Sequence, residues 1–179
     1  MNRIRLLVTA AMLAALSIVL EFVPLFYKFG DIKIDLVGLP WVIATMLLGL
    51  VGGLITSAVT AIVMSLLTPT GWIGAFMKLS ATIPLVLLLG IVSRKFGHSL
   101  KVMLAAFVAA LVVRCIGMVY LNYYFAMPVF WNMPLEAALQ YPAELIIIPN
   151  AALSIIEFAG AYLLVSKTRL RERLNARGA

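Results

Sequence analysis

Residues 120–134, YLNYYFAMPVFWNMP, hold the densest group of side chains with directional chemistry in the sequence. Aromatic rings can stack on a flat ligand, and amides can hydrogen-bond to its polar edge. A belt of aromatic residues at a membrane surface would account for isolated Tyr and Trp side chains. It would not account for the amides that accompany them, which are Asn122, Asn132, Gln140 and Asn150. The combination favours a binding site for a polar heteroaromatic molecule.

Four ionisable side chains stand inside or at the edges of long apolar segments: Lys78, Arg114, Glu144 and Glu157. An isolated charge is costly in hydrocarbon, so each should face a partner or a cavity. With a rise of about 1.5 Å per residue, Arg114 and Glu157 lie at heights that differ by about 6 Å, within reach of two long side chains. We therefore expect them to pair, either as a structural tie or with a ligand beside them.

Lys78 and Glu144 fall at the same level as Asn122 and Asn150. They either extend toward lipid headgroups or line one outward-facing pocket together with these amides. Glu21, at the outer end of the first apolar segment, fits both interpretations.

No pattern in the sequence predicts catalysis. There is no HExxH motif, no phosphate-binding glycine loop and no paired-carboxylate motif, and the single histidine, His98, stands in the basic segment RKFGHSLK. We predict that the protein is not an enzyme and has no catalytic residues, no metal site and no cofactor.

The elements that position these groups are apolar. The chain has 179 residues, of which 64% are hydrophobic and 12% charged, whereas soluble domains are about 45–50% apolar. Pro, Gly and charged residues divide it into six segments of spanning length. These segments are 5–23, 37–51, 53–67, 75–93, 102–126 and 143–165. We predict an all-α, multi-pass membrane protein with a single six-helix domain over 1–179, in which 166–179 form a basic tail. The second and third spans should form a tight hairpin at GLVGG, residues 49–53.

The basic residues fix the expected orientation. With six spans, ten of them fall on one side of the membrane: Arg3, Arg5, Arg94, Lys95, Lys101, Lys167, Arg169, Arg171, Arg173 and Arg177. The positive-inside rule makes this side cytoplasmic, with both termini inside and loops 24–36, 68–74 and 127–142 outside. The net charge of +7 is then a topology signal that also favours anionic lipids, and we expect no nucleic-acid partner.

Several segments resemble the substrate-binding S components of energy-coupling factor (ECF) vitamin transporters. TAAMLAALSIVL resembles the first helix of that family, with its Ala-xxx-Ala face matched by Ala10 with Ala14 and by Ala11 with Ala15. IDLVGLPWVIATMLLGLVGGLITSAVT is similar to the second and third helices, and TGWIGAFMKLSATIP to the following loop and helix. YLNYYFAMPVFW is like a segment of riboflavin-specific members. The resemblance covers most of residues 8–165.

The resemblance implies a subunit of a prokaryotic plasma membrane that captures a water-soluble vitamin, here riboflavin, at its outer face. A separate membrane scaffold subunit and two cytoplasmic ATPases would energise the import, and loop 24–36 would close over the ligand as a lid. The substrate-binding residues expected on this basis and from the residue types are Asp35, Trp72, Lys78, Asn122, Tyr123, Tyr124, Trp131, Glu144, Asn150 and Ser154. The scaffold would contact Ala10, Ala11, Ala14 and Ala15, although small residues also serve packing within a chain.

Other interpretations stay open at this point. The sequence departs from riboflavin-specific members at Ser154, where a Lys is expected, and at Lys78, where an amide is expected, so the ligand could be another vitamin or small nutrient. A structural morphogenesis protein of the rod-shape type has a similar hydropathy profile, and a stand-alone secondary transporter would show inverted repeats.

Overall fold

The computed structural model describes residues 3–23, 28–29, 32–33 and 35–167. The elements in chain order are α1 (Arg3–Phe22), β1 (Lys28–Phe29), β2 (Ile32–Lys33), α2 (Leu39–Leu67), α3 (Gly71–Phe96), α4 (Leu100–Leu121), the π-helix η1 (Asn122–Ala126), α5 (Met127–Phe130), α6 (Leu135–Leu139) and α7 (Glu144–Lys167). The two strands form only a short antiparallel ladder within the segment expected to be a loop and lid. The rest of that segment up to residue 34, and the tail from 168 onward, lie outside the described residues. The all-α prediction is confirmed.

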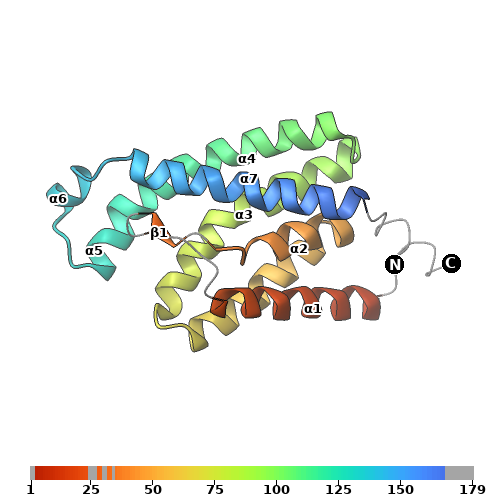
Figure 1. Ribbon diagram of the computed structural model, residues 1–179, viewed down its shortest axis with the longest axis horizontal. Helices are drawn as coiled ribbons and strands as arrows, with labels where there is room; N and C mark the ends of the chain where they lie inside the picture. The colour runs from red at the N-terminus through yellow and green to blue at the C-terminus, as the bar shows by residue number, and fades with distance from the viewer. Residues whose placement is uncertain (1–2, 24–27, 30–31, 34, 168–179) are drawn as a thin grey trace.

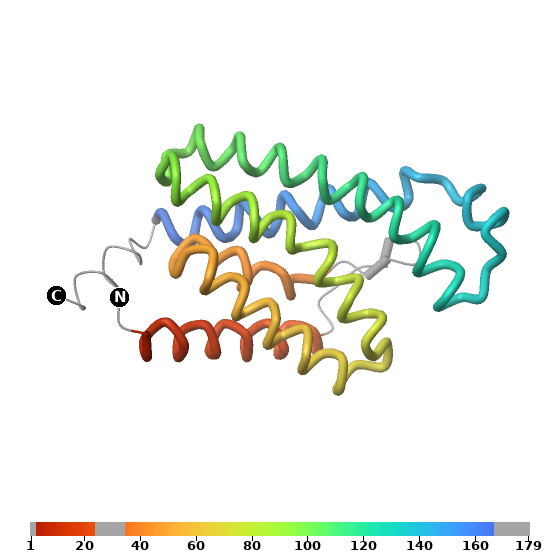
Figure 2. The backbone as a smooth tube through the Cα atoms, turned by 180° about the vertical axis from the view of Figure 1, so that it is seen from behind, coloured from red at the N-terminus to blue at the C-terminus, as the bar shows by residue number. Residues whose placement is uncertain are grey.

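Within the part of the chain that the structure describes, five helical segments are long and apolar enough to cross a membrane, and one of them, α2, contains two spans. Its backbone leaves the helical conformation at Gly49, where φ is 79° and ψ is −174°, a region that is essentially restricted to glycine. The two halves pack so closely that a Cβ atom at Gly53 would collide with Thr45. The chain therefore doubles back at the first glycine of GLVGG, as Figure 2 shows, and the predicted hairpin and six spans are confirmed.

The two ends of the bundle differ. At one end α1 begins, α3 turns into α4, and α7 finishes (Figure 1). We call this the basic end, because Arg3, Arg5, Arg94, Lys95 and Lys101 lie there. The opposite end carries the turn between α2 and α3, together with α5 and α6. The fold therefore brings these five together at one end, in agreement with the topology argument, whereas Arg169, Arg171, Arg173 and Arg177 lie outside the described residues.

The largest cluster of buried apolar side chains lies toward the basic end. There the first half of α2 meets α3, α4 and α7, and the rings of Phe107 and Phe158 stack with their centroids 4.5 Å apart. Many large apolar side chains on the outer surfaces of the helices are exposed, as expected where lipid replaces water as the solvent. The opposite half of the bundle is less completely filled, and it holds the candidate site.

Candidate functional site

A cavity of about 250 Å³ opens in the half of the bundle that lies away from the basic end. It lies among α1, α2, α3, α4, η1, α5 and α7. Its polar lining residues are Glu21, Asp35, Thr70, Lys78, Arg114, Asn122 and Asn150. Three methionines, Met64, Met77 and Met118, contribute flexible apolar walls, and Phe130 and Trp131 add aromatic rings. An apolar cavity with a few converging polar groups is the usual form of a small-molecule site.

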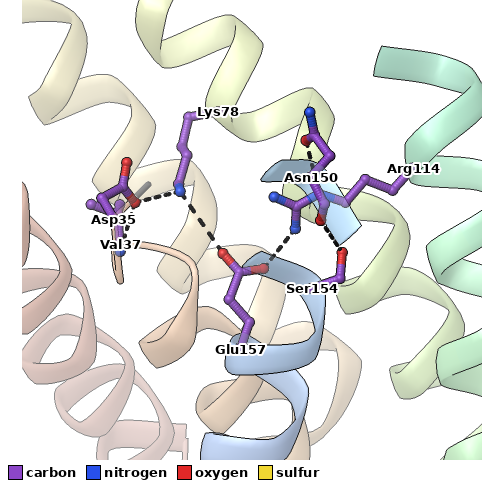
Figure 3. A network of polar contacts seen from close by, with 7 residues as sticks. All are labelled: Asp35, Val37, Lys78, Arg114, Asn150, Ser154 and Glu157. Carbon is purple, nitrogen blue, oxygen red and sulfur yellow. Dashed lines mark hydrogen bonds and ion pairs between the residues drawn. The ribbon is translucent and has the colours of Figure 1, made fainter. Parts of the chain in front are cut away.

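A network of buried charges, shown in Figure 3, contributes Asp35, Lys78 and Arg114 to the lining of the cavity. Lys78 pairs with Asp35, and its Nζ atom lies 3.8 Å from Oε1 of Glu157. Arg114 donates from Nη1 to Oε2 of Glu157 over 2.7 Å, and neither of these two side chains is exposed. The expected pairing of Arg114 with Glu157 is therefore confirmed, and the structure extends it to four charges on α3, α4, α7 and the turn before α2.

The acidic members are held in place by the backbone around them. Asp35 accepts a hydrogen bond from the backbone N–H of Val37 over 3.0 Å, which fixes its carboxylate at the turn that leads into α2. Gly38 packs against the Glu157 carboxylate so closely that a Cβ atom there would collide with it. The absence of a side chain at Gly38 thus lets the start of α2 approach α7 and brings Asp35 and Glu157 to the same cation, Lys78.

The amide of Asn150 connects Arg114 to α7. Its Oδ1 accepts from Nε of Arg114 over 3.2 Å, and its Nδ2 donates to the carbonyl of Ile146 over 2.9 Å. Ser154 lies behind it and donates to the Asn150 carbonyl over 2.8 Å. Two of the guanidinium's donor nitrogens are therefore committed to α7, which fixes the orientation of the group toward the cavity.

Asn122 reaches the cavity from the start of the π-helix. Pro128 has no N–H, and a proline ring crowds the carbonyl four residues earlier in a regular α-helix. Here the N–H of Met127 bonds to the carbonyl of Asn122, five residues back, so the helix is a wider π-helix for one turn. The Asn122 amide is buried and donates to the carbonyl of Met118 over 2.7 Å, so its Oδ1 is the group available to a ligand.

Half of the predicted substrate-binding residues line this cavity, and half lie elsewhere. Those that line it are Asp35, Lys78, Asn122, Trp131 and Asn150. Ser154 is buried behind Asn150, and Tyr123 ties η1 to the segment before α7 by donating to the Tyr141 carbonyl over 2.7 Å. Trp72, Tyr124 and Glu144 are exposed.

The exposed aromatic residues among these make contacts with neighbouring rings. Tyr124 packs against Tyr120 in a tilted arrangement with 4.7 Å between ring centroids, and Trp72 and Phe125 meet edge to face at 6.2 Å. For Trp72 and Tyr124 the aromatic-belt interpretation therefore describes the structure better than the pocket interpretation.

The cavity also contains residues that the sequence analysis did not assign to it. Arg114 was expected to pair with Glu157, with contact to a ligand left open. Glu21 was left undecided, and the methionines were not singled out. A signal was present: Arg114, Met118 and Asn122 recur every four residues, so they share one face of α4 and its continuation. Gly74, Lys78 and Ala81, spaced by four and three residues, likewise share one face of α3.

The expected scaffold contact on α1 needs a correction. Ala10 and Ala14 are fully buried within the chain, because they pack against α2, where Thr56 donates from Oγ1 to the Ala10 carbonyl over 3.3 Å. They form a packing surface inside the subunit and cannot contact another protein in this arrangement. Ala11 and Ala15 lie on the neighbouring stripe of α1 and are exposed.

Comparisons with known proteins agree with this fold. Residues 5–166 match the model of the family described as ECF transporter, substrate-specific component. The chain is also similar to the solved structure of the S component of a bacterial ECF transporter, with a TM-score of 0.76, 24% sequence identity, and coverage of 97% of this chain and 99% of that one. A search of curated proteins found no match. The family match spans most of the sequence, and the chain therefore belongs to the substrate-specific S components of ECF transporters.

Proposed function

We propose that this subunit captures a water-soluble vitamin, riboflavin, in the cavity beside Arg114 and Asn122, at the face of the membrane opposite the basic end. A separate scaffold subunit and two ATPase subunits then drive its delivery inward. The observation that carries the proposal is the cavity itself, in which polar groups converge from α1, α3, α4, η1 and α7 and from the turn before α2.

The composition of the lining suits a heteroaromatic vitamin. Phe130 and Trp131 offer ring faces for stacking. Asn122 offers a hydrogen-bond acceptor and Arg114 offers a donor. The polar edge of a flavin ring carries both donors and acceptors and can bond to each of them. The methionine walls can adapt to the outline of a fused ring system. Lys78, which stands where an amide is expected in riboflavin-specific members, is the residue that favours a different vitamin as the alternative.

The scaffold contact belongs on the exposed side of α1. Ala11 and Ala15 leave a shallow strip there, flanked by exposed apolar side chains such as Val8 and Met12. In lipid, small residues let a second helix approach closely, and packing is then the main attraction between the two helices. Docking through Ala11 and Ala15 would leave the interface of Ala10 and Ala14 with α2 intact.

The proposal is tested by purifying the protein in detergent without added ligand and recording its visible absorption and fluorescence. A tight riboflavin binder should be purified with flavin bound or should bind added riboflavin with quenching of the flavin emission. A colourless protein that does not bind riboflavin, but binds another vitamin in a titration panel, would replace riboflavin with that vitamin. Reconstitution with the scaffold and ATPase subunits should then give ATP-dependent uptake into vesicles.

A further inference from the structure

The charges beside the cavity balance one another. Lys78 and Arg114 carry two positive charges, and Asp35 and Glu157 carry two negative charges. All four side chains are almost completely buried, with relative exposures of 11%, 0%, 7% and 0% respectively. Each charge has an opposite charge in contact, so the network as a whole is neutral and already compensated before any ligand enters.

One donor in this network has no acceptor. Arg114 donates through Nε to Asn150 and through Nη1 to Glu157. Its Nη2 atom is buried and has no hydrogen-bond partner among the residues that the structure describes. Figure 3 shows the guanidinium group lying above Glu157, with one terminal nitrogen directed away from that carboxylate toward the side of Lys78. A buried N–H group without an acceptor costs free energy, and a ligand that supplies an acceptor removes this cost.

The charge balance restricts which acceptor is suitable. A cationic group would find Asp35 and Glu157 already neutralised by Lys78 and Arg114, and it supplies no acceptor for Nη2 of Arg114. An anionic ligand would find these cations already neutralised by Asp35 and Glu157, and it would also face Glu21, a partly buried carboxylate on the same cavity. Either ligand would bring an uncompensated charge into a site with little water, which is unfavourable.

We infer that the cavity selects an uncharged ligand with a carbonyl or comparable oxygen that accepts a hydrogen bond from Nη2 of Arg114. Arg114 is then the residue that determines this specificity, and the neutral network of Lys78, Asp35 and Glu157 holds it in place. The inference rests on the proposed function, because it takes this cavity as the substrate site, and it adds the charge class of the substrate.

The first test compares probes that differ mainly in charge. Nicotinamide with nicotinate, and panthenol with pantothenate, are such pairs, and riboflavin is added as an uncharged heteroaromatic probe. Affinities are measured by titration calorimetry on the detergent-solubilised protein. We expect riboflavin or the uncharged member of a pair to bind at least about tenfold more tightly than any charged probe. Equal or tighter binding of a carboxylate would overturn the inference, whereas the proposal that this cavity binds a water-soluble vitamin would stand. Failure of every probe to bind would refute the proposed function and the inference with it.

The second test alters the network. Arg114→Gln should weaken binding of the uncharged probe by at least about tenfold. Lys101→Gln removes an exposed positive charge at the start of α4 and should have no effect. A folded Arg114→Gln variant, with a size-exclusion profile like that of the wild type, that retains full affinity would overturn the inference.

Neutralising a carboxylate gives the complementary result. Glu157→Gln leaves the network with one excess positive charge, so the preference for the uncharged probe over its carboxylate counterpart should fall by at least about tenfold. Asp35→Asn makes the same change of charge on another element and serves if Glu157→Gln does not fold. An unchanged preference in a folded variant of either kind would show that charge balance does not set the selectivity.

Discussion

Breaking the pair of Arg114 and Glu157 should reveal how strongly the two charges depend on each other. The side chains are fully buried and meet at 2.7 Å. Removal of one member of such a pair leaves the other charge buried without compensation, at a cost of roughly 3–5 kcal/mol. We therefore expect Glu157→Leu and Arg114→Met each to lower the free energy of unfolding by about this amount.

The double variant should be far more stable than the sum of these losses indicates. It contains no unpaired charge at these positions, and Lys78 keeps Asp35 as a partner. The remaining defect is the Asn150 Oδ1 atom, which loses the donor Nε of Arg114, a loss of about 1–3 kcal/mol. The coupling free energy from the double-mutant cycle should thus exceed about 2 kcal/mol.

The cycle can be measured by unfolding the protein in mixed micelles with increasing fractions of a denaturing detergent. Far-UV circular dichroism and tryptophan fluorescence should report the same transition. Val113→Ala, at an exposed position next to Arg114 on α4, provides a matched control that should change stability little. A coupling free energy near zero would refute the view that these two charges stabilise each other.

Three further predictions concern the hairpin, the docking strip and the cavity. Gly49→Ala should lower the free energy of unfolding in the same assay by about 1–3 kcal/mol because of its backbone conformation, whereas Gly117→Ala, on an open stretch of α4, should be neutral or stabilising. Ala11→Trp should abolish ATP-driven uptake and leave ligand binding unchanged, and normal uptake in this variant would remove the case for docking at this strip. Asn122→Ala should weaken riboflavin binding by about 1–3 kcal/mol in calorimetry, while Tyr124→Phe, outside the cavity, should not.

The sequence predicted the helices well because lipid imposes simple requirements on length and polarity. The apolar segments, the glycine-rich reversal and the clustering of basic residues were all visible in it. The pairing of Arg114 with Glu157 could also be predicted, since height along two antiparallel helices follows from counting residues. These features depend on local sequence and on the position of a residue along the membrane normal.

Features that depend on the rotation of a helix about its axis could not be predicted in the same way. On α1, the two alanine stripes are adjacent, and both offer small residues four positions apart. Only the packing of α2 decides that Ala10 and Ala14 are covered and that Ala11 and Ala15 are exposed. The same limitation explains Trp72 and Tyr124, whose level in the membrane was compatible with the cavity but whose side chains lie on other faces of their helices.

The contact of Lys78 with Asp35 illustrates a third kind of feature. It joins residues 43 positions apart and depends on the turn before α2, where Asp35 is held by the Val37 N–H and where Gly38 allows α7 to come close. Through Lys78 and Glu157, this turn is connected to Arg114 on α4. A ligand that binds Arg114 therefore contacts a charge network that extends to Asp35, in the segment that connects α1 to α2. Arg114 and the turn that holds Asp35 belong to one set of buried charges, so a substitution in the turn should alter ligand binding at Arg114.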